Sequence, residues 1–249
     1  MARLLNKTAL ITGGTTGIGF ATAQQFLKEG ARVAITGQDA GRVTEAAKQL
    51  GAGVIAIRAN VSSAEDMQAV ATRLQSEFGG LDILFANAGI AKVSPLTDVD
   101  EAHIDEQFDV NVKGVIFTVQ KLLPLLRNPA SILLTSSTAA QQGMAGMSVY
   151  SASKAAVRSL ARSLSAELIG RGVRVNSISP GPIETPIFGK LGLPSEAVGQ
   201  MAEQIKSGIP AGRFGQADEI AKLAVFLASD ESSYIVGEDF LIDGGSATI

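Results

Sequence analysis

The sequence predicts one α/β domain of 249 residues, built on a parallel sheet of about seven strands with helices on both faces. Short aliphatic or β-branched runs alternate with longer stretches of helical periodicity along the chain. The short runs are apolar throughout, which is typical of strands covered on both faces. A glycine-rich turn follows the first run, and only seven strands are expected. Both features favour an open, doubly wound sheet over an eight-unit barrel.

The expected elements follow one another without a linker, so a single domain over 1–249 is predicted. Strands are expected at residues 7–11, 32–36, 54–58, 81–85, 131–135, 173–178 and 239–242. Helices are expected at residues 17–29, 39–50, 63–78, 101–126, 149–169 and 217–228. Gly30 is a plausible end for the first helix, because glycine tolerates the left-handed conformation found there. Right-handed crossovers should connect the parallel strands.

The segment from about 185 to 215 is too long for an ordinary connection and is predicted to be a lid over the substrate. Its apolar members are Ile187, Phe188, Leu191, Leu193 and Met201. Met144 and Met147 are expected to line the same pocket. Together they favour an apolar carbonyl or alcohol substrate, although packing of the lid onto the core explains them equally well.

Composition excludes several function classes. With 21 Lys and Arg against 24 Asp and Glu, the net charge is −3, so binding to nucleic acid through phosphate contacts is not expected. The absence of cysteine and the single histidine, His103, exclude thiolate chemistry, Ser-His-Asp hydrolysis and a histidine-based metal site. Neither a secretory signal nor an apolar stretch of ~18 residues is present, which predicts a soluble cytoplasmic protein without a membrane segment.

The turn after the first strand reads Thr-Gly-Gly-Thr-Thr-Gly-Ile-Gly over residues 12–19. Glycines at such a turn let the backbone approach a pyrophosphate, and the following helix presents free N–H groups to it. The alternative is a tight turn without a ligand. The spacing is GxxxGxG and differs from the GxGxxG of the general dinucleotide fingerprint.

Tyr150 and Lys154 lie four residues apart at the start of a predicted helix, so their side chains share one face. An ammonium group near a phenol favours the phenolate, and we expect Lys154 to move the tyrosine pKa toward working pH. Ser137 follows the fifth strand near the same edge of the sheet and can hold a substrate oxygen. Taken alone, the Tyr–Lys spacing is also compatible with chance.

Together these residues resemble the short-chain dehydrogenase/reductase (SDR) family, in its branch of about this length, over nearly the whole chain. Residues 12–19 resemble its TGxxxGxG turn, Asn87-Ala88-Gly89 its NAG motif, and residues 180–185 its PGxxxT segment. Ser137, Tyr150 and Lys154 match its catalytic Ser, Tyr and Lys. The resemblance implies a Rossmann-like fold, a nicotinamide cofactor and a homotetramer, with the helices beginning near 101 and 149 at one interface.

The resemblance also implies residue roles. Tyr150 is the general acid or base, Ser137 orients the substrate oxygen, Lys154 binds the ribose, and Asn111 supports a proton-relay water. The residues expected to bind the cofactor are Gly13, Thr15, Thr16, Gly17, Ile18, Gly19, Gln38, Asn60, Val61, Asn87, Ala88, Gly89, Tyr150, Lys154, Pro180, Gly181, Ile183 and Thr185. The hydride chemistry belongs to the cofactor.

The end of the second strand bears on the choice between NADP and NAD. Gly37 stands where NAD-dependent relatives carry an acid, and Gln38 and Thr16 stand where NADP-dependent relatives often carry a base. Asp39 is expected to cap the next helix, and Arg42 can reach a 2′-phosphate. These residues favour NADP and leave NAD open. Asn60 replaces an acid and is expected to accept the adenine amino group through its carbonyl.

The predicted function is therefore an NAD(P)-dependent ketone reductase or alcohol dehydrogenase. A dinucleotide-binding sensor without turnover is the alternative from another class, but the Tyr–Lys pair and the glycine turn that such a protein is expected to lose are both intact. Epimerases and dehydratases of the same fold generally carry a larger substrate domain, which this chain lacks.

Overall fold

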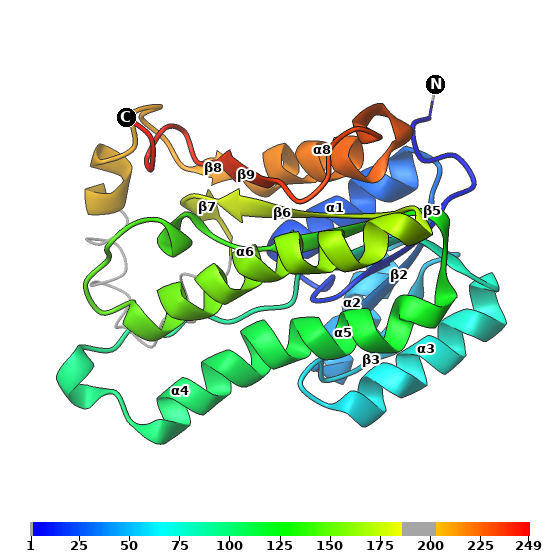
Figure 1. Cartoon of the computed structure of the whole chain (residues 1–249), viewed down its shortest axis with the longest axis horizontal. Coiled ribbons are helices and arrows are strands. Elements are labelled where there is room, and N and C mark those ends of the chain that lie inside the picture. The colour runs from blue at the N-terminus through cyan, green and yellow to red at the C-terminus, as the bar shows by residue number, and fades with distance from the viewer. Residues whose placement is uncertain (1, 186–202) are drawn as a thin grey trace.

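A single parallel sheet organises the chain. The computed structural model describes residues 2–185 and 203–249. Its main sheet has the strand order β3-β2-β1-β4-β5-β6-β9, with every neighbouring pair parallel (Figure 1). The strands are β1 (Thr8–Ile11), β2 (Arg32–Gly37), β3 (Ile55–Arg58), β4 (Leu81–Ala86), β5 (Leu126–Thr135), β6 (Val173–Pro180) and β9 (Asp239–Ile242). The predicted doubly wound fold is confirmed.

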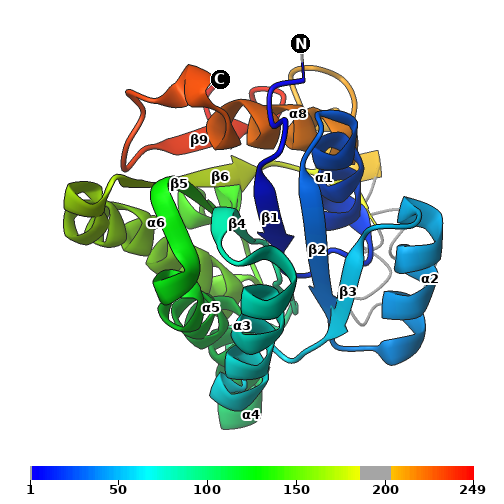
Figure 2. The ribbon, with the colours of Figure 1, turned by 90° about the vertical axis from the view of Figure 1, so that its right-hand side faces the viewer.

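Helices cover both faces of this sheet (Figure 2). One face carries α1 (Gly17–Lys28), α2 (Ala40–Leu50) and α8 (Ala217–Ala228), and the other carries α3 (Ala64–Phe78), α5 (Gly114–Leu122) and α6 (Ser148–Leu168). Each face has its own apolar core, because successive strand residues point to opposite sides: Leu84 packs toward α3 and α5, whereas Phe85 packs toward α1 and α8. None of the helices in the described part of the chain has the length and apolarity needed to span a bilayer.

The strand order reverses between β1 and β4, which pair directly through Ala9↔Ile83 and Ile11↔Phe85. The crossovers from β1 and from β4 lie on opposite faces of the sheet. Their first turns therefore separate beyond the carboxyl ends of the two strands and leave a crevice there. This is the position of the glycine turn and of Asn87-Ala88-Gly89.

The long helix expected at 101–126 is divided. It consists of α4 (Glu101–Phe108), a π-helical turn (Asp109–Lys113) and α5, followed by a 3₁₀ turn (Leu123–Leu125). Pro124 has no N–H and ends the regular helix before it. Strand β5 therefore begins at Leu126 and not at 131.

A second sheet of two parallel strands, β7 (Ile183–Glu184) and β8 (Gly215–Gln216), was not predicted. Two residues are too few to show any periodicity in a sequence. These strands flank the segment predicted as a lid. Its expected apolar contacts Ile187, Phe188, Leu191, Leu193 and Met201 lie outside the described residues.

Candidate functional site

A cavity of about 550 Å³ lies at the carboxyl edge of the main sheet. It is lined by residues that follow β1, β2, β3, β4, β5 and β6, together with Tyr150 and Lys154 of α6. The predicted cofactor residues that line it are Gly13, Thr15, Thr16, Gly17, Ile18, Gln38, Asn60, Val61, Asn87, Ala88, Gly89, Pro180, Gly181, Ile183 and Thr185. Ser137 lines it as well, whereas Gly19 and Asn111 lie behind its wall.

The glycine turn depends on close backbone approach. Gly13 has a φ of +64° and Gly17 a φ of +55°, values that side-chain-bearing residues rarely adopt. A Cβ at Gly19 would lie 2.4 Å from the Gly13 carbonyl oxygen and 2.6 Å from Asn87 Nδ2. Gly19 therefore lets α1 pack tightly against the turn. Thr16, at the N-cap of α1, makes no side-chain cap hydrogen bond, and Gly17 and Ile18 of the first turn line the cavity, which suits an anion there.

Asn87 joins three neighbouring strands at this edge. Its Nδ2 donates to the carbonyl oxygen of Thr12 at 3.0 Å, and its Oδ1 accepts from Thr135 Oγ1 at 3.2 Å. The Thr12 hydroxyl accepts from the backbone N–H groups of Asn87 and Ala88. The ends of β1, β4 and β5 are therefore fixed relative to one another before any ligand binds.

Lys154 is buried, with 4% of its surface exposed, and no carboxylate lies within ion-pair distance of it among the described residues. Its Nζ donates to the Thr135 carbonyl oxygen at 2.8 Å. This bond uses one of the three N–H donors of the ammonium group. A Cβ at Gly89 would lie 3.1 Å from this Nζ, so the glycine leaves room for the ammonium group. The two remaining donors suit hydroxyl groups of a ribose in the cavity.

Asn111 is fully buried in the π-helical turn (Asp109–Lys113). Its side-chain amide bonds both the N–H and the carbonyl oxygen of Ile90, each at 2.9 Å. Its Nδ2 also donates to Ser153 Oγ at 3.0 Å, and that hydroxyl donates to the Tyr150 carbonyl oxygen. Asn111 thus connects the segment after β4 to the first turn of α6. π-turns of this kind frequently occur at functional sites.

Burial and hydrogen bonding act in opposite directions on the Tyr150 phenol. Burial raises the pKa of the Tyr150 phenol, and a hydrogen bond with the Ser137 hydroxyl only partly offsets this rise. The Lys154 Nζ lies 5.9 Å from the centre of the Tyr150 ring. Burial also lowers the pKa of Lys154, to about 8. Ser137 Oγ accepts from Ala139 N–H at 3.1 Å, which holds its turn in place.

At the adenosine end, the absence of an acid at Gly37 has a steric reason. A Cβ there would lie 2.6 Å from Thr15 Cγ2 and 3.1 Å from Val43 Cγ2. Asp39 caps α2 as expected, because its Oδ1 accepts from Arg42 N–H at 2.7 Å. The Arg42 guanidinium Nε lies 3.7 Å from the same oxygen, and both residues line the cavity.

Asn60 lines the cavity, but its contacts disfavour the expected acceptor role. Its Oδ1 already accepts from Ser62 N–H at 3.1 Å and from Ser62 Oγ at 2.9 Å. A carbonyl oxygen has two lone pairs, so the group that Asn60 has left for a ligand is its amide donor.

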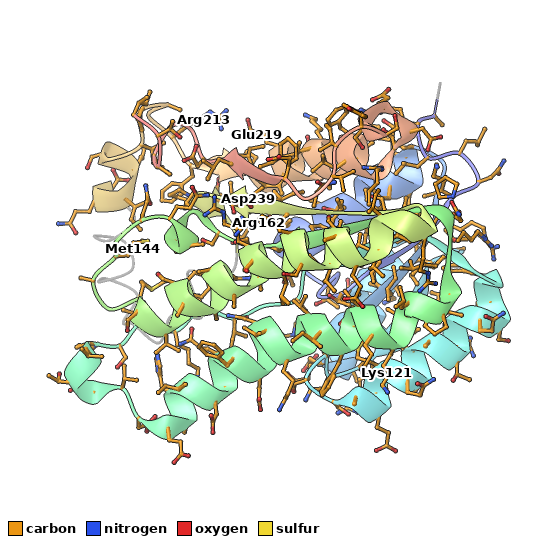
Figure 3. The ribbon with its side chains drawn as sticks, in the orientation of Figure 1. Lys121, Met144, Arg162, Arg213, Glu219 and Asp239 are labelled. Carbon is orange, nitrogen blue, oxygen red and sulfur yellow. The ribbon has the colours of Figure 1, made fainter. Side chains whose placement is uncertain are left out.

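Met144 is 41% exposed, and neither it nor Met147 is among the described lining residues of the cavity. The lid residues with which they are expected to form a pocket lie outside the described residues. Figure 3 shows Met144 on the loop that precedes α6.

Sequence reasoning missed several lining residues: Thr36, Ala59, Ile90, Ala91, Lys92, Glu106, Val110, Thr135, Ser136 and Pro182. Most of them directly end a strand or follow one, so their position at the carboxyl edge was the available signal. Thr36 is fully buried, and its hydroxyl has no hydrogen-bond partner in the described part of the chain.

The family model described as "Enoyl-(Acyl carrier protein) reductase" matches residues 13–247. The chain belongs to the SDR family. "Oxidoreductase asL5" of Sarocladium schorii is 41% identical to this SDR, and the match covers 99% of this SDR and 98% of the relative. "Galactitol 2-dehydrogenase" of Agrobacterium fabrum is 36% identical, with 98% of each chain covered.

A solved structure extends this similarity to three dimensions. The 3-ketoacyl-(acyl-carrier-protein) reductase from Brucella melitensis complexed with NADH has a TM-score of 0.91 and 32% identity, and the match covers 98% of this SDR and 99% of that chain. Members of the family are NAD(P)-dependent oxidoreductases. This SDR is accordingly an NAD(P)-dependent enzyme acting on CH–OH or C=O groups.

The buried lysine predicts a pH-dependent stability. Its pKa falls from 10.5 in the unfolded chain to about 8 in the fold, so between these values the unfolded state binds more protons and stability rises with pH. Relative to Lys154→Met, the wild-type free energy of unfolding should increase by about 3 kcal/mol between about pH 7 and pH 10. Urea unfolding across this range measures it.

Lys48→Met is the matched control, because Lys48 is an exposed lysine on α2. Its stability difference from the wild type should stay constant over the same pH range. A constant difference for Lys154→Met as well would contradict the assignment of a costly buried ammonium group.

Proposed function

We propose that this SDR interconverts a ketone and a secondary alcohol by hydride transfer, with Tyr150 as the general acid or base. One observation carries the proposal: the wall of a dinucleotide-sized cavity holds Tyr150, Ser137 and Lys154 together, backed by Asn111. The glycine turn and the start of α1, which has no side-chain cap, fit a nicotinamide dinucleotide. When bound, this cofactor supplies or accepts the hydride.

The raised pKa of Tyr150 suits the reducing direction. A phenol that stays protonated at neutral pH can donate its proton to the carbonyl oxygen as negative charge develops there. The Ser137 hydroxyl, which lowers the pKa of the same phenol, orients the substrate oxygen between the two groups. In the oxidising direction the phenolate is needed, so alcohol oxidation should gain rate as the pH rises.

Lys154 has two roles in this mechanism. Its free donors bind ribose hydroxyl groups, and its ammonium charge faces the site whenever Tyr150 becomes anionic. Because its pKa is about 8, it is mainly charged at neutral pH. Asn111 connects the segment of Ile90 to the first turn of α6 through its hydrogen bonds. It thereby fixes the position of Tyr150 relative to the segment that follows β4.

The substrate is proposed to be a small carbonyl compound or alcohol with an apolar body. Ile90, Val110 and Pro182 support this, because they line the same cavity as Tyr150. The name of the Agrobacterium relative indicates a polyol, and that of the Brucella relative indicates an acyl thioester. Turnover should therefore be compared for three substrate classes: apolar ketones, sugars and acyl thioesters.

Tyr150→Phe tests the reaction. The variant keeps the ring but cannot transfer a proton, so we expect turnover with the best substrate to fall by at least about 10²-fold, while cofactor affinity changes little. Nicotinamide absorbance measures turnover, and a fluorescence titration of the reduced cofactor measures binding. Undiminished turnover in Tyr150→Phe would contradict the proposed role. Tight binding with no turnover in the wild type would favour a sensor.

NADP is proposed as the preferred cofactor, with Arg42 as the cation for its 2′-phosphate. The crowding of Thr15 and Val43 around Gly37 supports this, since it leaves no room for an acid that would select NAD. Asp39 opposes a phosphate through its charge, but that charge is shared with the Arg42 N–H and guanidinium group.

Two substitutions separate these charges. Arg42→Ala should raise KM for NADPH about tenfold and leave KM for NADH nearly unchanged, because only NADPH carries the 2′-phosphate. Asp39→Ser keeps a helix cap but removes the charge, and should lower KM for NADPH. Steady-state kinetics with both cofactors measures each effect. Equal changes for NADH and NADPH would contradict recognition of the 2′-phosphate.

A homotetramer is proposed as the assembly. Ile104 on α4 and Ile116 on α5 are both 42% exposed, which supports a partner surface on this face of the sheet. Ile116→Glu should shift the mass in solution toward a smaller species, because the interface would have to bury an unpaired charge. Lys48→Glu, on α2 across the sheet, is the control. Light scattering after size exclusion gives the mass, and a wild-type monomer would overturn the proposal.

A further inference from the structure

Asp239 is a buried carboxylate outside the cavity lining, and its contacts lead to the segments that carry the catalytic groups. It is the first residue of β9, and its side chain is 7% exposed. Figure 3 shows it between the start of β9 and helix α6. A buried carboxylate is costly unless charge and hydrogen bonds compensate it, so the identity of its partners is informative.

Both carboxylate oxygens are engaged. Oδ1 accepts from Ser177 Oγ at 2.6 Å and from Ser179 Oγ at 2.8 Å, both on the neighbouring strand β6. Oδ2 accepts from Gln141 Nε2 at 3.0 Å and lies 3.0 Å from Arg158 Nε. The Arg158 contact is an ion pair by distance, since its N–H is not aligned on the oxygen.

The two partners of Oδ2 belong to the two segments that carry Ser137 and Tyr150. Gln141 ends the 3₁₀ turn that begins after Ser137, and its N–H donates to the Thr138 carbonyl oxygen. Arg158 lies on α6, four residues after Lys154 and eight after Tyr150. One oxygen atom therefore connects the turn of Ser137 to the helix of Tyr150.

We infer that Asp239 is a positioning residue that sets the distance between the Ser137 hydroxyl and the Tyr150 phenol through Gln141 and Arg158. The inference rests on the proposed function, because it concerns how that site is aligned. Gln141 itself is exposed, so its side chain has no packing role that would explain a loss of activity.

Gln141→Glu tests this with little risk to folding. It places a second carboxylate against Asp239, so the turn of Ser137 should separate from α6. We expect kcat to fall roughly tenfold with KM for the cofactor unchanged, because the cofactor cavity is not touched. The double variant Gln141→Glu/Asp239→Asn again places one carboxylate opposite one amide at the contact between residues 141 and 239, although residue 239 no longer carries a charge for Arg158. It should recover part of the lost kcat.

Ser177→Ala is the matched control. It removes a hydrogen bond to the same carboxylate but leaves the Gln141 contact, so it should lower the unfolding temperature and leave kcat unchanged. If kcat of Ser177→Ala fell together with its unfolding temperature, the inference would be overturned, because Asp239 would then have a purely structural role.

A second readout does not need turnover. The chain has two tyrosines and no tryptophan, so in a Tyr234→Phe background the ultraviolet absorbance of tyrosinate reports Tyr150 alone. Because the Ser137 hydrogen bond lowers the pKa of Tyr150, its loss in Gln141→Glu should raise the apparent pKa, and the double variant should reverse this. Unchanged titration in Gln141→Glu would overturn the inference. Absent wild-type turnover would contradict only the proposed function.

Discussion

The burial of the Lys154 ammonium group, which has no carboxylate partner among the described residues, is the constraint on which the site depends. A buried cation is unfavourable, and within the described part of the chain one neutral acceptor, the Thr135 carbonyl oxygen, holds it. A carboxylate would have stabilised the charge, but it would also have occupied the donors that a ribose requires. The protein tolerates a local loss of stability in order to keep a cation available at the cavity wall.

Much of the surrounding structure holds this lysine in place. Thr135 accepts from it through the main chain and donates to Asn87 through the side chain. Asn87 in turn reaches Thr12 beside the glycine turn, and Ser136 donates to the Lys154 carbonyl oxygen. The glycine-turn end and the Tyr150 end of the cavity are thus parts of one hydrogen-bond network across adjacent strand ends. Such preorganisation lowers the entropic cost of aligning two reactants.

The main sheet and most of the cavity could be predicted because both follow from local sequence patterns. Continuous apolar runs predict the strands, and the polar or glycine residues directly after these runs predict the cavity lining. Burial and partner choice are tertiary properties, which the linear sequence does not display. The Asn60 carbonyl oxygen accepts from Ser62, and burial raises the pKa of Tyr150. The π-turn at Asp109–Lys113 has no periodicity of its own to detect.

The short parallel pair β7–β8 fixes two distant parts of the chain beside each other. By holding Ile183 and Glu184 against Gly215 and Gln216, it brings the ends of the intervening segment together at the rim of the cavity. The residues just before β8 are anchored as well, because Ile209 is buried and the Ala211 N–H donates to the Gly244 carbonyl oxygen. The rim of the cavity is thereby joined to the last residues of the chain, so a change near the C-terminus is transmitted to the edge of the site.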